Sequence, residues 1–126
     1  VVEFDDQCAL IAWARNRLVL QAHPELALLE GSMNGVKLTL GQAGKAKAAG
    51  MLKGSPDLTL PFARGGYIGL KIELKHGKNK ATAEQLDILQ KLGDAGHKTL
   101  IVWGWDAARQ EIESYLALPK TELKAA

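Results

Sequence analysis

Apolar and polar residues alternate strictly along residues 67–75, Tyr-Ile-Gly-Leu-Lys-Ile-Glu-Leu-Lys. Because successive side chains of a strand point to opposite faces, this segment is predicted to be a β-strand with one apolar and one polar face. The apolar face carries Ile68, Leu70, Ile72 and Leu74. The polar face carries Tyr67, Lys71, Glu73 and Lys75. A carboxylate and a lysine are therefore expected to emerge side by side near the end of this strand.

Two other segments also have the composition of strands. Residues 57–61 form a short strand that ends at Pro61, and Arg64-Gly65-Gly66 makes the turn into residues 67–75. Residues 99–104 are a continuous apolar run. Such a run is typical of a strand covered on both faces, so a central position in the sheet is expected.

Helices are predicted on both sides of these strands. Residues 4–20 are rich in Ala, Leu, Ile and Trp, and Asp5 or Asp6 is expected to cap their N-terminus. A second helix is predicted from Thr82 to about Ala95, because Thr82 and Gln85 fit a capping box. A last helix is predicted from Asp106 to Leu118, before Pro119.

Residues 23–52 give weaker signals. Residues 26–29 fit a short strand or a helix, and Ser32-Met33-Asn34-Gly35 is predicted to be a turn. Residues 42–52 fit either a helix weakened by glycines or a basic loop.

The predicted order of elements is α-β-β-α-β-α, which places the chain in the α/β class with a mixed sheet flanked by helices. Residues 67–75, 82–95 and 99–104 form a βαβ unit, whose two strands are expected to be parallel. A chain of 126 residues is expected to be a single domain, residues 1–126. The three tryptophans are expected to lie in its core.

Composition excludes several classes of function. The single cysteine, Cys8, is expected to be buried, and no Cys/His cluster has the spacing of a zinc site. No apolar run reaches the length of a membrane span, and the acidic start of the chain is unlike a signal peptide. We therefore expect no membrane partner, a cytoplasmic location, and no organic cofactor.

Charge is distributed unevenly along the chain. Residues 37–80 carry nine basic and two acidic side chains, a net charge of +7, whereas the rest of the chain is at −5. The two acidic residues of this basic segment are Asp57 and Glu73. The pattern fits a surface that attracts a polyanion, and it fits equally a solvated surface with scattered lysines.

Asp57, Glu73 and Lys75 come together if the strand at 57–61 pairs with the strand at 67–75. Two carboxylates and a lysine at one point of a sheet can bind a divalent metal and activate water against a phosphodiester. Each has a simpler alternative: Asp57 can cap a turn, Glu73 and Lys75 can form the exposed face of an edge strand, and Gln85 can serve its capping box alone.

The motifs in this order resemble the VRR-NUC family, the virus-type replication-repair nucleases of the PD-(D/E)XK superfamily. The segments that carry the resemblance are Glu3 with Gln7, Asn34-Gly35, 50–58, 72–75, and 82–85 with Leu92, Gly96 and 99–104. They span nearly the whole chain. One departure is the sequence Asn-Gly-Val-Lys at 34–37, where a second glycine and an arginine are expected nearby.

The resemblance implies a metal-dependent DNA nuclease with a restriction-endonuclease-like core. Asp57, Glu73 and the backbone carbonyl of Leu74 would bind Mg²⁺ or Mn²⁺, with Glu3 as a further carboxylate. Lys75 would orient water or stabilise charge, and Gln85 would face the site. The expected DNA contacts are Asn34, Lys45, Lys47, Lys53, Lys78 and Lys80.

The resemblance also implies partners and a setting. Small standalone members of the family resemble Holliday junction resolvases, so a homodimer that cuts branched DNA for repair is expected, in a bacterial or phage-infected cell. Its interface is expected in residues 26–40 or in the last helix. Two alternatives remain: a nucleic-acid-binding module without catalysis, and a restriction-type endonuclease, which has little room for a separate recognition domain.

Overall fold

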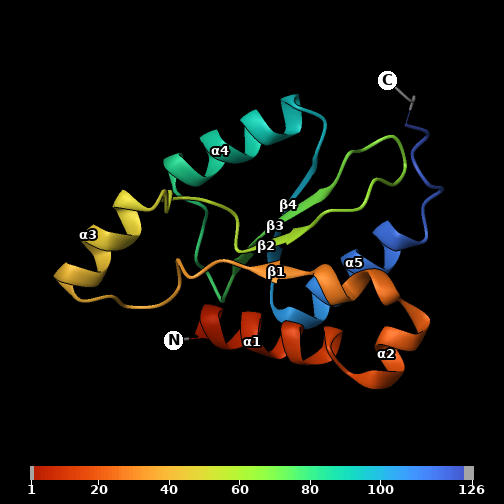
Figure 1. Ribbon diagram of the computed structural model, residues 1–126, viewed down its shortest axis with the longest axis horizontal. Coiled ribbons are helices and arrows are strands. Elements are labelled where there is room, and N and C mark those ends of the chain that lie inside the picture. The colour runs from red at the N-terminus through yellow and green to blue at the C-terminus, as the bar shows by residue number, and fades with distance from the viewer. Residues whose placement is uncertain (1, 124–126) are drawn as a thin grey trace.

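The computed structural model describes residues 2–123 and consists of a mixed four-stranded sheet with helices on both faces (Figure 1). The expected α/β class is therefore confirmed. The helices are α1 (Val2–Ala14), α2 (Arg17–Ala22), η1 (Pro24–Leu28, a 3₁₀ helix), α3 (Leu40–Ala48), α4 (Ala83–Asp94) and α5 (Trp105–Leu116). The strands are β1 (Glu30–Gly31), β2 (Leu58–Leu60), β3 (Leu70–Lys75) and β4 (Lys98–Trp103), in the spatial order β1-β2-β3-β4.

The two faces of the sheet are covered by different helices. Helix α4 packs on one face, and α1 and α5 pack on the other and against each other (Figure 1). The main core lies on the α1/α5 side. Its fully buried members include Leu10, Leu26, Leu29, Leu58, Leu60, Leu70, Ile72, Leu74, Ile112 and Tyr115. None of the helices in the described part of the chain is both long and apolar enough to span a membrane.

The alternation predicted for β3 is confirmed in its second half. Leu70, Ile72 and Leu74 are each 1% exposed and belong to the core. β3 pairs antiparallel with β2, with Ile72 opposite Leu58. The strand begins at Leu70 rather than at Tyr67, because Gly65 and Gly66 take positive φ angles of 61° and 89° and extend the turn.

The βαβ unit has the predicted parallel pairing, but β4 lies at an edge of the sheet, not at its centre. α4 and α5 cover the two faces of β4, so the strand is apolar without having a second strand neighbour. A continuous apolar run indicates that both faces of a strand are buried, but it does not indicate whether the strand is central or at an edge of the sheet.

Two predicted helix boundaries are wrong at the N-terminus. The helix predicted over 4–20 is divided into α1 and α2, because the Asn16 side chain accepts hydrogen bonds from the N–H groups of Leu18 and Val19 and starts a new helix. Asp5 and Asp6 lie inside α1, which begins at Val2, so neither is its cap. Cys8 is exposed on α1, contrary to expectation.

Of the two helix starts nearer the C-terminus, one differs from the prediction and one is confirmed. α5 starts at Trp105 after Gly104, whose φ of 86° turns the chain directly out of β4, so Asp106 lies in the first turn and does not cap the helix. The capping box of α4 is confirmed in both directions: Gln85 N–H donates to Thr82 Oγ1 at 3.1 Å, and Thr82 N–H donates to Gln85 Oε1 at 2.9 Å.

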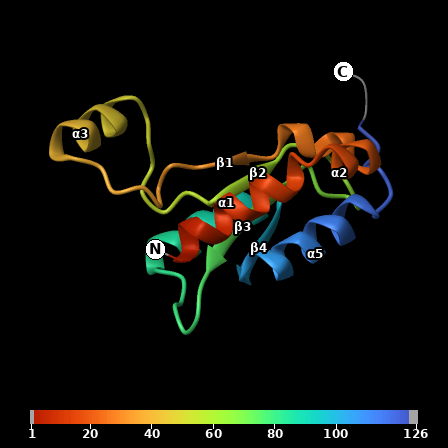
Figure 2. The same cartoon turned by 90° about the horizontal axis from the view of Figure 1, so that it is seen from below.

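The weakly predicted region contains a second capping box. Thr39 and Gln42 exchange hydrogen bonds at the start of α3, which resolves the choice between helix and loop in favour of a helix. α3 stands away from the sheet at the end of a long excursion between β1 and β2 (Figures 1 and 2). None of its side chains is buried.

Candidate active site

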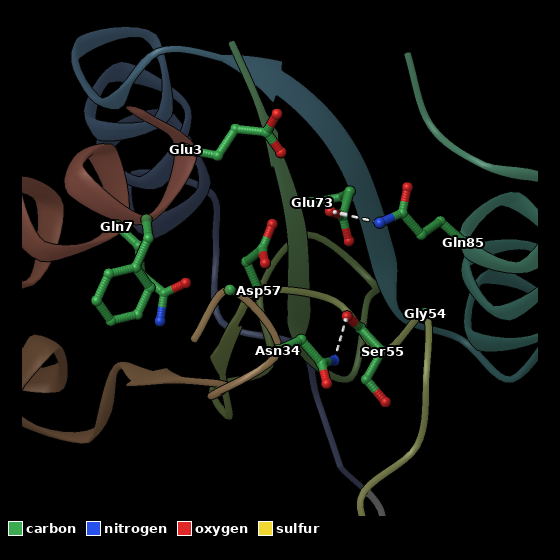
Figure 3. A pocket seen from close by; sticks show the side chains of 10 residues that line it. Glu3, Gln7, Asn34, Gly54, Ser55, Asp57, Glu73 and Gln85 are labelled. Carbon is green, nitrogen blue, oxygen red and sulfur yellow. Dashed lines mark hydrogen bonds between the residues drawn. The ribbon is translucent and has the colours of Figure 1, made fainter. Parts of the chain in front are cut away.

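A cavity of about 190 Å³ opens where α1, the turn after β1, the segment before β2, β3 and α4 meet (Figure 3). Its lining residues are Glu3, Phe4, Gln7, Asn34, Gly35, Gly54, Ser55, Asp57, Glu73 and Gln85. Five of the residues predicted from the sequence therefore line a single cavity: Glu3, Asn34, Asp57, Glu73 and Gln85.

Asp57 is held at the end of the paired region of β2 and β3. Its Oδ2 accepts a hydrogen bond from the Leu74 N–H at 2.7 Å, two residues beyond the last backbone pair of these strands, Leu58 with Ile72. The carboxylate thus replaces the backbone partner that a longer β2 would have supplied. The carbonyl of Leu74 lies on the same edge of β3 as its N–H, and so on the side of Asp57.

Glu73 is the most constrained side chain of the cavity. It is 2% exposed, and its Oε2 accepts a hydrogen bond from Gln85 Nε2 at 3.2 Å (Figure 3). Its other oxygen, Oε1, is buried and has no hydrogen-bond partner among the described residues. A buried polar atom without a partner is costly and is rare in folded proteins.

Burial, followed by a hydrogen bond and charge repulsion from the neighbouring Asp57 carboxylate, raises the pKa of Glu73 from 4.5 to about 8. Lys75 acts in the opposite direction but is the weaker influence. Two facing carboxylates, one of them with an unsatisfied oxygen, fit a divalent cation, because an oxygen-preferring cation would satisfy Oε1 and remove the repulsion.

Lys75 is almost fully buried, at 5% exposure. Its ammonium nitrogen lies 3.6 Å from Glu73 Oε2 and 3.8 Å from Glu3 Oε1. Lysine is seldom buried unless it is paired, so these two carboxylates account for its position. The simpler alternative, in which Glu73 and Lys75 form the exposed face of an edge strand, is wrong: both are buried, and β3 is an inner strand.

Gln85 performs both of the roles considered for it. Its Oε1 accepts the capping hydrogen bond from Thr82, while its Nε2 donates to Glu73. The amide thus starts α4 and orients the buried carboxylate at the same time.

Glu3 lines the cavity but is engaged elsewhere. Its Oε2 accepts a hydrogen bond from Asn79 Nδ2 at 2.5 Å, and its Oε1 faces Lys75. Across residues 2–123, no three His, Cys, Asp or Glu side chains are grouped closely enough to hold a metal. The acidic centre of the site is therefore the pair of Asp57 and Glu73.

A solved structure of a protein named "VRR_NUC domain protein" is similar to this chain over 98% of both chains, with a TM-score of 0.76 and 27% sequence identity. Over nearly its whole length, the chain is therefore similar to a VRR-NUC domain protein. The resemblance predicted from its motifs is thus confirmed, and the sheet and helices are consistent with a restriction-endonuclease-like fold. No protein-family model and no curated protein matches the sequence.

The five lysines predicted to contact DNA lie outside the cavity. Lys45 and Lys47 are on α3, and Lys78 and Lys80 are in the loop after β3. Lys53 is exposed, with its ammonium group 3.6 Å from Glu84. All five are placed where a long polyanion could contact them, and none touches the carboxylate pair.

Asn34 braces the wall of the cavity. Its Nδ2 donates to the backbone carbonyls of Leu52 and Ser55, at 3.4 and 3.3 Å, and so ties the turn after β1 to the segment before β2 (Figure 3). Of the predicted DNA contacts, it is the one that lines the cavity.

Sequence reasoning missed two features of the site. Gly54 has a φ of 88° and lies against α4, where an added Cβ would come within 3.3 Å of the Glu84 backbone. Asn79, which lies between Lys78 and Lys80, holds Glu3 through its side chain. A glycine before a strand carries a weak signal for a tight turn, whereas nothing local to Asn79 indicates its partner.

Proposed function

We propose that the protein is a metal-dependent deoxyribonuclease that hydrolyses phosphodiester bonds in branched DNA. The observation that carries the proposal is the buried Glu73 carboxylate, whose partnerless Oε1 lies in a cavity shared with Asp57. A protein that only binds nucleic acid gains nothing from burying a carboxylate pair where phosphate must approach, because each charge repels the ligand.

Asp57, Glu73 and the Leu74 carbonyl would hold Mg²⁺ or Mn²⁺. All three are hard oxygen donors, which favour these ions over zinc. When bound, the cation would neutralise charge on the scissile phosphate and make water a better nucleophile at neutral pH.

Lys75 and Gln85 supply the remaining functions. The positively charged ammonium group of Lys75 lies beside Glu73. It would orient the attacking water or stabilise the charge that develops on the phosphate. Gln85 fixes Glu73 through Oε2 and leaves Oε1, which has no hydrogen-bond partner among the described residues, available to the cation. The reaction proposed is in-line hydrolysis without a covalent intermediate.

Contacts to DNA are assigned to the exposed lysines of the basic segment. Lys45 and Lys47 on α3 would hold one stretch of phosphates, and Lys53, Lys78 and Lys80 would hold phosphates near the cavity, with Asn34 at its wall. Binding that depends on phosphate charge releases counterions and falls steeply with salt.

We further propose a homodimer, which would present two active sites to the two strands of a four-way junction. Leu26 and Leu29 are core residues and are excluded from its interface, whereas Leu28, Met33 and Leu40 are 59%, 57% and 95% exposed. Their exposure supports an interface in residues 28–40. Sedimentation at micromolar concentration, with and without a junction, tests this; a monomer under both conditions contradicts it.

A panel of labelled substrates tests the proposed activity. Duplex, flap and four-way-junction DNA would be incubated with the protein in Mg²⁺, in Mn²⁺ and in EDTA. The expected result is cleavage of the flap and the four-way junction in Mg²⁺ or Mn²⁺, and no cleavage in EDTA. Binding without cleavage would identify a nucleic-acid-binding module, and cleavage of linear duplex at one sequence would identify a restriction-type enzyme.

A further inference from the structure

Trp103 is the last residue of β4, and its side chain is 47% exposed. The other two tryptophans behave as expected from the sequence, because Trp13 and Trp105 pack partly buried against the core. A half-exposed indole at the end of a strand presents an aromatic surface that a ligand can contact.

The position of Trp103 is tied to that of Lys75. The two residues are register partners in the parallel pairing of β3 and β4, so their side chains leave the sheet on the same face. Neighbouring strands lie about 4.8 Å apart. A nucleotide whose phosphate is held near Lys75 therefore has its base within reach of the indole ring.

The indole is also fixed in orientation. Its Nε1–H donates to the backbone carbonyl of Asn79 at 2.9 Å, while the side chain of Asn79 holds Glu3. Because the polar edge of the ring is already used, what remains for a ligand is the apolar π surface. Asn79 thus links this surface to the wall of the active site.

The charged residues near the Trp103 ring indicate what class of ligand it would bind. Lys78 and Lys80 flank Asn79 in the same exposed loop, which projects from the end of β3 (Figure 2). Aromatic side chains combined with a positively charged surface are the usual means of binding single-stranded nucleic acid, in which bases stack on the ring and lysines contact the phosphates. A protein partner would more often bury the ring among apolar neighbours, and this loop offers lysines instead.

We propose that Trp103 is a stacking platform for an unpaired nucleobase next to the phosphate that enters the active site. The inference rests on the proposed nuclease function and extends it. The site would accept a strand whose bases are exposed at a branch, a flap or an end, and it would disfavour a strand that is fully paired.

Binding measured without metal tests the platform separately from catalysis. Flap DNA and fully paired duplex of equal length would be titrated in EDTA, with 2-aminopurine at the unpaired position as the probe. Loss of one stacked base weakens single-strand binding by about 5- to 150-fold. Trp103→Leu is therefore expected to weaken flap binding in this range, to leave duplex binding within about twofold, and to abolish quenching of the probe.

Two further variants control for folding and for general aromatic effects. Trp103→Phe keeps an aromatic face but lacks the N–H, so intermediate affinity is expected. Tyr67→Leu removes another partly exposed ring, one that lies near Lys98 at the opposite end of β4, and should change neither affinity nor quenching. Melting curves verify that each variant is folded.

The outcomes separate the platform from the nuclease. Unchanged flap binding and quenching in folded Trp103→Leu would overturn the platform, even if the wild-type protein cleaves DNA normally. Loss of quenching in Trp103→Leu, in a protein that cleaves nothing in Mg²⁺ or Mn²⁺, would support the platform and overturn the nuclease instead.

Discussion

The carboxylate cavity and the excursion that carries α3 are built in opposite ways. At the cavity, Glu73 and Lys75 are buried, and each is held by a specific neighbour. Along residues 36–53, which we name the α3 arm, helix α3 buries none of its side chains, and Leu40 at its start is 95% exposed. Local structure in the α3 arm comes from its own capping box and not from packing.

Under the proposed function, this contrast would separate the chemistry from the contact with substrate. Burying charges demands that every partner stay in place, and Glu73 and Lys75 accordingly lie on an inner strand between helices. Contact with a long polyanion demands reach and adaptability, which an element with few buried contacts provides because it opens at low free-energy cost. The predictions below test whether the two regions are as independent as this division requires.

Replacing Glu73 should produce the largest effect. Glu73→Gln keeps the size of the side chain but removes the charge that would hold a cation, so the cleavage rate should fall on the order of 10³-fold or more. Asp57→Asn and Lys75→Ala should show losses of similar size. The matched control is Glu84→Gln on the surface of α4. Single-turnover cleavage of a junction measures all four, and near-normal cleavage by Glu73→Gln would show that the pair is not the active centre.

The second-largest effect should be a difference between mutations in the core and in the α3 arm, measured by the free energy of unfolding. Leu60→Ala removes a side chain that is 1% exposed, and it should lower the free energy of unfolding by about 2–5 kcal/mol. Leu40→Ala removes a side chain of the same size that is 95% exposed in a single chain, and in the monomer the change should stay within about 0.5 kcal/mol. Urea denaturation measures both, at protein concentrations below and within the micromolar range. A loss in Leu40→Ala that appears only at the higher concentration would place Leu40 in the proposed dimer interface, and a large loss at both would contradict its exposure.

The stability of the metal-free protein should depend on pH through Glu73. Its pKa is about 8 in the folded state against 4.5 as the ordinary value, so between these values the folded state binds a proton that the unfolded state lacks. Stability contributed by this proton is complete at low pH and is lost as pH rises through about 8. In EDTA, the melting temperature should fall by about 5 °C or more across this window.

Two comparisons isolate the contribution of Glu73 to that decline. Glu73→Gln should flatten the pH dependence, because it retains no titrating group at this position. Mg²⁺ should raise the melting temperature of the wild-type protein more at high pH than at low pH, since the cation takes the place of the proton. Equal pH profiles for the wild type and Glu73→Gln would contradict the predicted shift.

Changes in the α3 arm should alter the salt dependence of DNA binding but not the rate of cleavage. Neutralising Lys45 and Lys47 together should reduce the slope of log affinity against log salt by roughly two if both contact phosphates. The single-turnover rate at saturating protein should be unchanged. A double replacement of Lys91 and Lys120, which lie outside the basic segment, is the control. An unchanged slope in Lys45→Gln/Lys47→Gln would place the DNA elsewhere.

The elements around the cavity were predictable because their signals are local. The alternation along β3 and the capping box at Thr82 and Gln85 each depend on residues within one turn or strand. These two patterns placed Glu73, Lys75 and Gln85 on the correct elements, and the pairing of β2 with β3 then brought Asp57 near them.

What could not be predicted depends on neighbours distant in the sequence. Polar alternation indicates that Glu73 faces solvent, yet Gln85 and Lys75 enclose it. The apolar run of β4 indicates that helices cover its two faces, but it does not indicate that β4 lies at an edge of the sheet. Asn79 finds Glu3 more than seventy positions earlier in the chain. Trp103 was expected in the core, because a tryptophan next to an apolar run has no local mark of exposure.

Gln85 has a consequence for anyone who reads a mutational scan of this protein. One amide nucleates a helix and aligns a buried acid, so nearly every replacement at position 85 would lower both the yield of folded protein and its turnover. A scan scored on a single phenotype would report intolerance and could not assign its origin. Glutamate is the informative exception, because it preserves the capping box but directs a carboxylate at Glu73. A scan that selects for folded protein should therefore accept glutamate at position 85, whereas a scan that selects for activity should reject it.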